Sequence, residues 1–224
     1  MKLVIPRYGI SITLPENQVS ILTVENPEAY AWIVGDLWRQ CNGQAGEIIL
    51  SEIDEPFKIS SKMELIFNPY GINCNERKVL SKLYSEIQTY CHESFEEKFM
   101  QINSEAISLL EKLFTMVSYP MTIQYEMNFE GLLKLFDAKI DIEKVDIATY
   151  MLEYMKIKKK ILKVDVFVII NLKQFLSDEE LMELYKSLWY EKIFLVILEG
   201  VETRPCISGE KRILLDYDLC IIET

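Results

Sequence analysis

The chain has 224 residues, half of them hydrophobic, and a formal net charge of −11. This hydrophobic content suffices for a sizeable core and excludes global disorder, while the acidic balance, taken alone, argues against nucleic acid or an anionic membrane as a partner. No apolar run reaches the roughly 20 residues of a membrane span, the N-terminus shows no signal-peptide pattern, and the five cysteines include no CxxC pair. We therefore expect a cytoplasmic protein with reduced thiols and no membrane partner.

The first 60 residues predict strands around a single helix. Asn26, Pro27 and Glu28 supply an N-cap, a proline at the first helical position and an acid in the first turn, three signals that agree on where the helix begins. This helix is expected to end near Cys41. Strands are expected at 3–5, 10–14, 19–24, 47–53 and 57–59.

The middle of the chain, from Lys62 to Lys160, is dominated by helical periodicity. Asn75 is expected to cap the first of these helices, and Pro120 follows the second. The helices are predicted at 75–91, 102–117, 130–136 and 145–160. This part of the chain is therefore predicted to be an α-helical insertion between two β-containing ends.

The segment from Lys163 to Leu198 predicts a strand, a helix and a strand. Its first strand, VFVII, is apolar throughout, as in a parallel sheet buried on both faces. Ser177 and Glu180 form a capping box that begins a helix through about Trp189. The second strand covers 193–198. These elements predict one right-handed βαβ unit.

Taken together, the predicted elements indicate the α/β class with two domains. We expect a discontinuous α/β domain built from residues 1–60 and 150–224, and a helical domain over 61–149 inserted into it.

A parallel sheet raises the question of nucleotide binding, but the sequence contains neither GxxxxGK[ST] nor GxGxxG. The strand VFVII resembles the one that carries the magnesium-binding acid of nucleotide hydrolases, yet it ends in Asn171. We expect no bound nucleotide. The alternative that stays open is a divergent metal-dependent nucleotide hydrolase or nuclease that uses Glu126, Glu130, Asp216 or Asp218.

One short segment reverses the charge of the chain, because residues 144–163 hold six basic and two acidic side chains. Lys156, Lys159 or Lys160, and Lys163 fall on one face if the helix continues that far, and Lys158 lies off that face. Stabilisation of a helix C-terminus accounts for one or two lysines. Contact with phosphates, which needs no sequence-specific residues, accounts for the whole group, and its effect adds up in a symmetric oligomer.

A second candidate site lies near Asn128, where Glu126 and Glu130 could offer oxygen ligands to a hard cation such as calcium. Two carboxylates and an amide are too few to define a site alone. A solvated acidic surface is the alternative interpretation.

The order and spacing of several segments resemble a known family. These segments are LVIPRYGISITL, SILTVENPEAYAWIV, ELIFNPYGINCNERKVLSKLYSEI, YMLEYMKIKKKILKVDVFVIINLKQFLSDEELMEL, LVILEG and ILLDYDLCII. Together they are similar to the type II-A CRISPR-associated spacer-acquisition proteins, which form ring tetramers around double-stranded DNA ends.

The resemblance implies a protein that is not an enzyme, with an α/β head and a helical leg, related to nucleotide hydrolases that have lost the phosphate loop. It implies a homotetrameric ring that binds double-stranded DNA without sequence preference and works with other CRISPR adaptation proteins. The lysines expected to contact DNA are Lys58, Lys62, Lys156, Lys158, Lys159, Lys160 and Lys163.

The resemblance also implies structural calcium held by acids in the leg. At the matching stretch, MTIQYEMNFEGLL, Thr122 and Gln124 stand where relatives carry acids, and Glu126 and Glu130 remain. The expected ligand set is therefore reduced.

Overall fold

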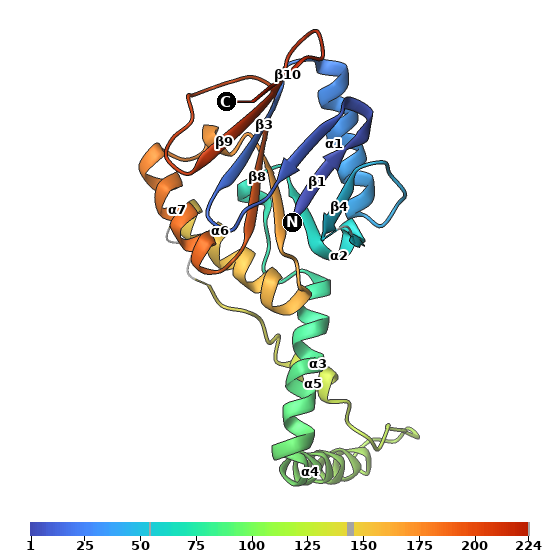
Figure 1. Cartoon of the computed structure of the whole chain (residues 1–224). Coiled ribbons are helices and arrows are strands. Elements are labelled where there is room, and N and C mark those ends of the chain that lie inside the picture. The colour runs from blue at the N-terminus through green and yellow to red at the C-terminus, as the bar shows by residue number, and fades with distance from the viewer. Residues whose placement is uncertain (54, 143–145, 224) are drawn as a thin grey trace. The chain divides into compact units, whose positions relative to one another are not determined.

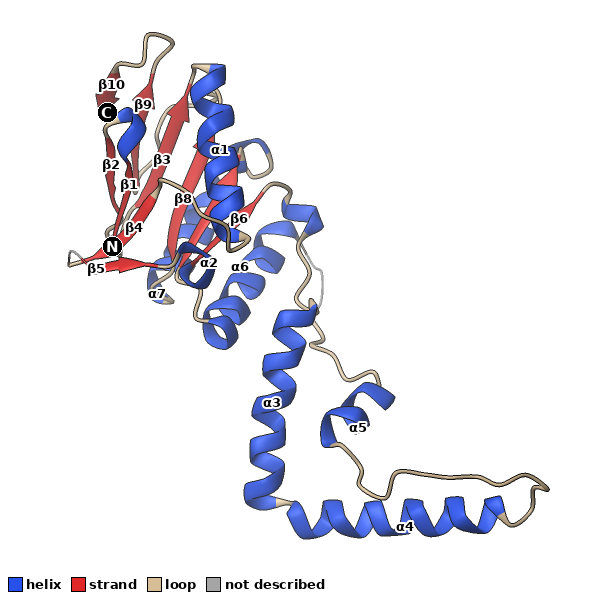
Figure 2. Cartoon of the chain, turned by 90° about the vertical axis from the view of Figure 1, so that its right-hand side faces the viewer, coloured by secondary structure: helices blue, strands red, loops and turns tan. Residues whose placement is uncertain are grey.

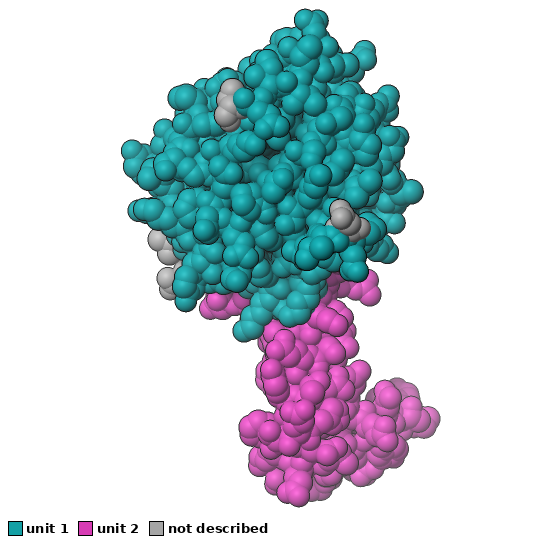
Figure 3. All heavy atoms as spheres, in the orientation of Figure 1, with its two compact units in different colours: residues 1–74, 142–224 teal, residues 75–141 magenta. Residues whose placement is uncertain are grey.

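The computed structural model describes residues 1–53, 55–142 and 146–223, which divide into two units. Unit 1 combines Met1–Cys74 with Ile142–Thr224, and unit 2 is Asn75–Asp141 (Figure 3). Figure 1 labels the seven α-helices of the described residues and several of the strands, numbered in chain order. Within the described residues, no helix combines the length and the apolar character that crossing a bilayer requires.

Unit 1 is built on a six-stranded sheet in the order β10-β9-β3-β8-β7-β6 (Figure 2). Every neighbouring pair is parallel except β9 and β10, which are antiparallel. Its strands are β3 (Val19–Val24), β6 (Met63–Ile66), β7 (Val166–Ile170), β8 (Phe194–Glu199), β9 (Glu210–Leu215) and β10 (Ile221–Glu223). All five residues of β7 are buried, as the apolar run VFVII predicted.

A second, antiparallel sheet in unit 1 has the order β2-β1-β4-β5. Its strands are β1 (Lys2–Ile5), β2 (Ile10–Thr13), β4 (Ile49–Glu52) and β5 (Glu55–Phe57). β1 and β2 are joined by a short turn, η1 (Pro6–Tyr8), which ends at Gly9 with φ 68°. Glycine adopts this left-handed conformation without steric cost.

Two helices of unit 1 begin where the sequence predicted, whereas residue 59, expected to end a strand, begins the short helix α2 (Ile59–Lys62). α1 (Pro27–Cys41) starts after Asn26, whose side chain accepts hydrogen bonds from two amides of the first turn. α7 (Asp178–Tyr190) starts with the capping box of Ser177 and Glu180, and with β7 and β8 it completes the predicted βαβ unit. The remaining elements of unit 1 are α2 (Ile59–Lys62), η2 (Pro69–Gly71), α6 (Ile147–Ile157), the π-turn η3 (Lys158–Leu162) and η4 (Leu172–Gln174).

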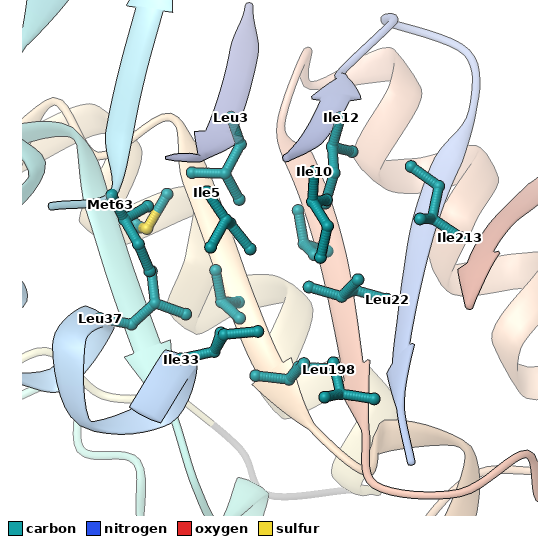
Figure 4. Packing of buried hydrophobic residues seen from close by; sticks show 14 of the residues in the cluster. Leu3, Ile5, Ile10, Ile12, Leu22, Ile33, Leu37, Met63, Leu198 and Ile213 are labelled. Carbon is teal, nitrogen blue, oxygen red and sulfur yellow. The ribbon is translucent and has the colours of Figure 1, made fainter. Parts of the chain in front are cut away.

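The main core of unit 1 lies between the two sheets and α1 (Figure 4). Aliphatic side chains of the small sheet pack against those of the large sheet, and side chains from one face of α1 belong to the same cluster. The labelled members are Leu3, Ile5, Ile10, Ile12, Leu22, Ile33, Leu37, Met63, Leu198 and Ile213.

The buried carboxylate of Asp36 joins α1 to the loop before β4. It accepts hydrogen bonds from the amides of Glu47 and Ile48 at 3.1 and 3.0 Å, and from the side chain of Gln40 at 2.8 Å. Burial opposes ionisation, but the hydrogen bonds from Ile48, Gln40 and the Arg39 guanidinium outweigh it and hold the pKa of Asp36 below its ordinary value.

A carboxyl with a lowered folded-state pKa stabilises the fold above its unfolded-state pKa, about 3.9, and this contribution is lost as the pH falls further. We expect Asp36→Asn to lower the free energy of unfolding at neutral pH by about 1–3 kcal/mol, because the amide places a donor against backbone donors. The free energy of unfolding of this variant should also fall less steeply than that of the wild type as the pH is lowered into the acidic range. Urea unfolding across acidic and neutral pH measures both effects. Glu47→Gln, at an exposed neighbour, should keep the wild-type profile; an equally steep acid limb in Asp36→Asn would contradict the assignment.

Unit 2 is helical and consists of α3 (Arg77–Ser94), α4 (Glu96–Phe114) and α5 (Phe129–Leu135) with their connections. Tyr84 of α3 donates its hydroxyl to the carbonyl of Ala138 at 2.5 Å, and the side chain of Asn103 of α4 bonds the backbone of Tyr125 and Met127. α4 begins six residues earlier than the predicted start at 102.

Two boundaries differ from the sequence-based ones. Residues 61–74 were assigned to the helical domain, but β6 pairs with β7 in the large sheet and belongs to unit 1. At the other end, α6 begins at Ile147 and also belongs to unit 1; its predicted start, Val145, lies outside the described residues. Asn75 does not cap α3, because its side chain bonds the backbone of Ile140 instead.

Candidate nucleic-acid interface

The basic segment follows α6 and changes helical pitch there. α6 ends at Ile157, and η3 continues as a π-turn to Leu162. Lys163 closes it with φ 62°, and its amide donates to the carbonyl of Lys159 at 3.1 Å. π-turns and non-glycine residues at positive φ are uncommon and occur often at functional sites. The irregular turn changes which lysines share a face.

Five of the seven predicted lysines line one hollow of about 570 Å³ in unit 1, together with two carboxylates. We call this site the basic hollow. Its lining residues are Lys62, Lys156, Lys159, Lys160, Lys163, Asp165 and Glu191.

Three of these lysines are held by carboxylates. Asp165 accepts from Lys62 at 2.7 Å and lies 3.6 Å from the ammonium of Lys159. Lys156 pairs with Glu153 at 2.8 Å and lies 3.9 Å from Glu191. The hydrogen bond to Glu153 raises the pKa of Lys156. The carboxylates therefore fix the positions of these three ammonium groups.

Lys160 and Lys163 are the exposed members of the basic hollow. The ammonium of Lys163 donates to the carbonyl of Lys160 at 3.0 Å. Within the described part of the chain neither side chain forms an ion pair, so both retain their full charge for an external anion.

Two of the predicted lysines lie elsewhere. Lys158 is 4% exposed, pairs with Glu64 at 3.1 Å and lies over the ring of Tyr154. It points into unit 1 because the chain turns at η3, so we remove it from the candidate interface. Lys58 is exposed before α2 but does not line the basic hollow.

The basic hollow lies at the amino-terminal edge of the large sheet. Lys62 directly precedes β6, Asp165 directly precedes β7, and Glu191 stands three residues before β8. These strands are parallel, so their starts share one edge. Ligands of open α/β sheets bind at the opposite, carboxyl edge. The site is therefore not a displaced nucleotide pocket.

At the carboxyl edge, the N-terminus of α1 is occupied by the protein itself. The side-chain oxygen of Asn26 accepts from the amides of Glu28 and Ala29, both at 3.0 Å, and its amide donates to the carbonyl of Tyr217. Pro27 has no amide hydrogen to offer. The groups that would hold a phosphate at a helix N-terminus are thus already bonded.

Buried ion pairs connect the segment after β7 with β9, whose first residue is Glu210. Lys173 and Glu210 meet at 2.8 Å with neither side chain exposed, and the hydroxyl of Tyr185 donates to Glu210 at 2.7 Å. Glu199, at the end of β8, is fully buried 3.8 Å from Arg212, and burial raises its pKa. Sequence analysis missed this cluster because its members lie far apart in the chain.

The acids considered for metal chemistry serve other roles. Glu130 pairs with Lys134 at 2.8 Å, and Glu126, Thr122 and Gln124 are exposed. Among the residues that the structure describes, no three histidine, cysteine, aspartate or glutamate side chains group closely enough for a metal. Calcium binding at 122–130 therefore stays a prediction from the resemblance.

The C-terminal acids of the hydrolase alternative belong to a turn. The carboxylate of Asp216 accepts from the amides of Asp218 and Cys220 at 3.0 and 2.8 Å, in the connection between β9 and β10. The turn accounts for the two acids in the segment ILLDYDLCII, so a catalytic role is not needed to explain them.

Comparison with known proteins adds a fold and a family. The structure is similar to that of Stu0660 of Streptococcus thermophilus, with a TM-score of 0.62 and 14% identity over 100% of this chain and 76% of that one. An ATP-binding protein of an ABC transporter from Pyrococcus furiosus gives a TM-score of 0.37 and 12% identity, with 91% and 88% of the two chains covered, which is too low to establish a common fold.

At this identity the first likeness shows a shared fold only. No curated protein matches the sequence significantly. The profile of a family described as "CRISPR-associated protein (Cas_Csn2)" matches residues 40–219, which include all of unit 2, most of unit 1 and the whole basic hollow. The chain therefore belongs to the Cas_Csn2 family of CRISPR-associated proteins.

Proposed function

We propose that the chain is a non-catalytic protein that binds double-stranded DNA ends without sequence preference and supports the acquisition of new spacers in type II-A CRISPR adaptation. It acts in the cytoplasm as a ring-shaped homotetramer, together with other CRISPR adaptation proteins. The observation that carries this proposal is the basic hollow, five lysines and two carboxylates gathered in a chain of net charge −11.

The chemistry of the basic hollow suits phosphate contacts. Lysine is a point charge that binds phosphate without reading bases. None of the described residues that line the hollow has an aromatic or amide side chain for base recognition, so binding should depend on the DNA backbone. An acidic exterior is compatible with this role if the hollows of several copies face one duplex.

The apolar surface of unit 2 supports self-association. α4 is amphipathic, yet none of its 19 residues is buried. Ile102, Leu109 and Leu113, which share one face of the helix, are 40, 59 and 46% exposed. Apolar helix faces of this kind mark association sites in soluble proteins. A second copy of the same chain is the partner that a ring requires.

Size-exclusion chromatography with light scattering tests both parts of the proposal. We expect a mass near four times 26.3 kDa without ligand, and co-elution with a short linear duplex at low salt that is lost as salt rises. A covalently closed circle of the same sequence should bind more weakly than the linear form. A monomer, or equal affinity for circular and linear DNA, would contradict the ring or the end-binding proposal respectively.

A further inference from the structure

We propose that Asp165 and Glu191 attenuate the basic hollow, so that each protomer holds phosphate weakly and firm DNA binding requires several copies. This inference rests on the proposed function, because it concerns the same lysines. Two carboxylates that no local sequence pattern indicates would thus limit the affinity of each protomer for DNA.

The first observation is the placement of Asp165 between two lysines from different elements. Its two oxygens lie 2.7 Å from the Lys62 ammonium and 3.6 Å from that of Lys159. Lys62 ends α2, and Lys159 lies in η3. The side chain of Asp165 is only 19% exposed, so solvent screens this pairing less than it screens a surface pair.

The second observation is that the other carboxylate of the lining, Glu191, also lies near a lysine of the hollow. Its carboxylate lies 3.9 Å from Lys156, which also pairs with Glu153. Glu191 follows α7 directly. Thus the carboxylates reach the lysines of the hollow from two separate points of the chain.

The physical consequence follows from charge. An ammonium group already paired with a carboxylate neutralises an incoming phosphate less completely, and so releases fewer of the ions condensed on DNA. The carboxylates also repel the phosphate directly. Lys160 and Lys163, which form no ion pair with a described residue, then supply most of the attraction within one protomer.

Weak binding by each protomer matters because the affinities of linked copies for one duplex multiply. Five unopposed lysines per copy would hold a duplex too firmly for it to move through a ring. With two carboxylates in each hollow, single contacts exchange readily while several copies together retain the DNA. The structure thus links the composition of the hollow to binding by an assembly.

The test measures the dissociation constant of a linear duplex over a series of salt concentrations. We use the full-length wild type, Asp165→Asn, Glu191→Gln and the double variant. The double variant should bind about tenfold tighter than the wild type near 0.15 M salt, and its salt dependence should be steeper by up to about two phosphate equivalents per protomer. Glu191→Gln alone, which disturbs only a partly exposed lysine, should bind about threefold tighter.

Glu28→Gln is the matched control for each single variant, since Glu28 is exposed in the first turn of α1, at the carboxyl edge of the sheet. It changes the net charge by the same one unit and should alter affinity less than twofold. Weaker binding by Asp165→Asn or Glu191→Gln would show that the carboxylates position the lysines, and equal tightening by Glu28→Gln would show a bulk charge effect; either result overturns the inference. If the wild type binds no duplex, the proposed function itself fails.

Discussion

Replacing both Lys160 and Lys163 with glutamate is expected to reduce duplex binding at least about 100-fold near physiological salt, while the oligomer stays intact. These are the exposed lysines of the basic hollow. The double variant removes two positive charges and adds two negative ones in each protomer. The slope of affinity against salt should fall by about two phosphate contacts per protomer. Gel shifts over a salt series, with light scattering for the mass, provide both quantities.

The matched control reverses two lysines of unit 1 that do not line the basic hollow. Lys2→Glu with Lys211→Glu produces the same change in net charge, and both side chains are exposed. We expect it to weaken binding only a few-fold through the general field of the protein. If both double variants lose binding equally, or neither does, the basic hollow is not the DNA site.

The largest effect on stability is expected from Lys173→Met. This substitution keeps most of the side-chain volume but leaves Glu210 without its cation where neither residue is exposed. It also removes the hydrogen bond from Lys173 to the carbonyl of Pro205. Breaking one partner of a buried ion pair costs about 3–5 kcal/mol, which for a chain of this size corresponds to a melting temperature lower by about 10 °C. Thermal unfolding followed by circular dichroism measures the change.

A second substitution separates the lost pair from lost packing. Glu210→Gln in the Lys173→Met background removes the uncompensated charge and keeps an acceptor for Tyr185, although its amide then faces the backbone amide of Ile207. Part of the lost stability should therefore return. Lys186→Met, at an exposed position of α7, should change stability by no more than about 0.5 kcal/mol. A double variant no more stable than Lys173→Met would mean that the ammonium acts through packing alone.

Local signals in the sequence correctly predicted where two helices begin and which strand is buried. The Asn26-Pro27-Glu28 start of α1 and the capping box of Ser177 are confirmed because each depends on atoms within four residues. The apolar run of β7 predicted its burial on both faces for the same reason. These parts of the fold require no knowledge of the rest of the chain.

Contacts between distant segments could not be predicted in this way. β6 was assigned to the helical domain because its partner β7 lies about 100 residues later. The orientation of Lys158 depends on the π-turn, which a regular helical projection does not contain. Asp165 and Glu191 enter the basic hollow from other elements, so periodicity within the lysine-rich segment gives no indication of them.

The side chain of Asn75 has a consequence for how this architecture can change over time. Its oxygen accepts from the amide of Ile140 at 2.8 Å and its nitrogen donates to the carbonyl of the same residue at 2.9 Å, so the two ends of unit 2 are fastened together. A segment whose two ends are joined by hydrogen bonds can lengthen or shorten between them at little entropic cost, since loop-closure entropy grows only logarithmically with length. Homologous proteins can therefore carry helical units of very different size while the sheet that bears the basic hollow retains its register.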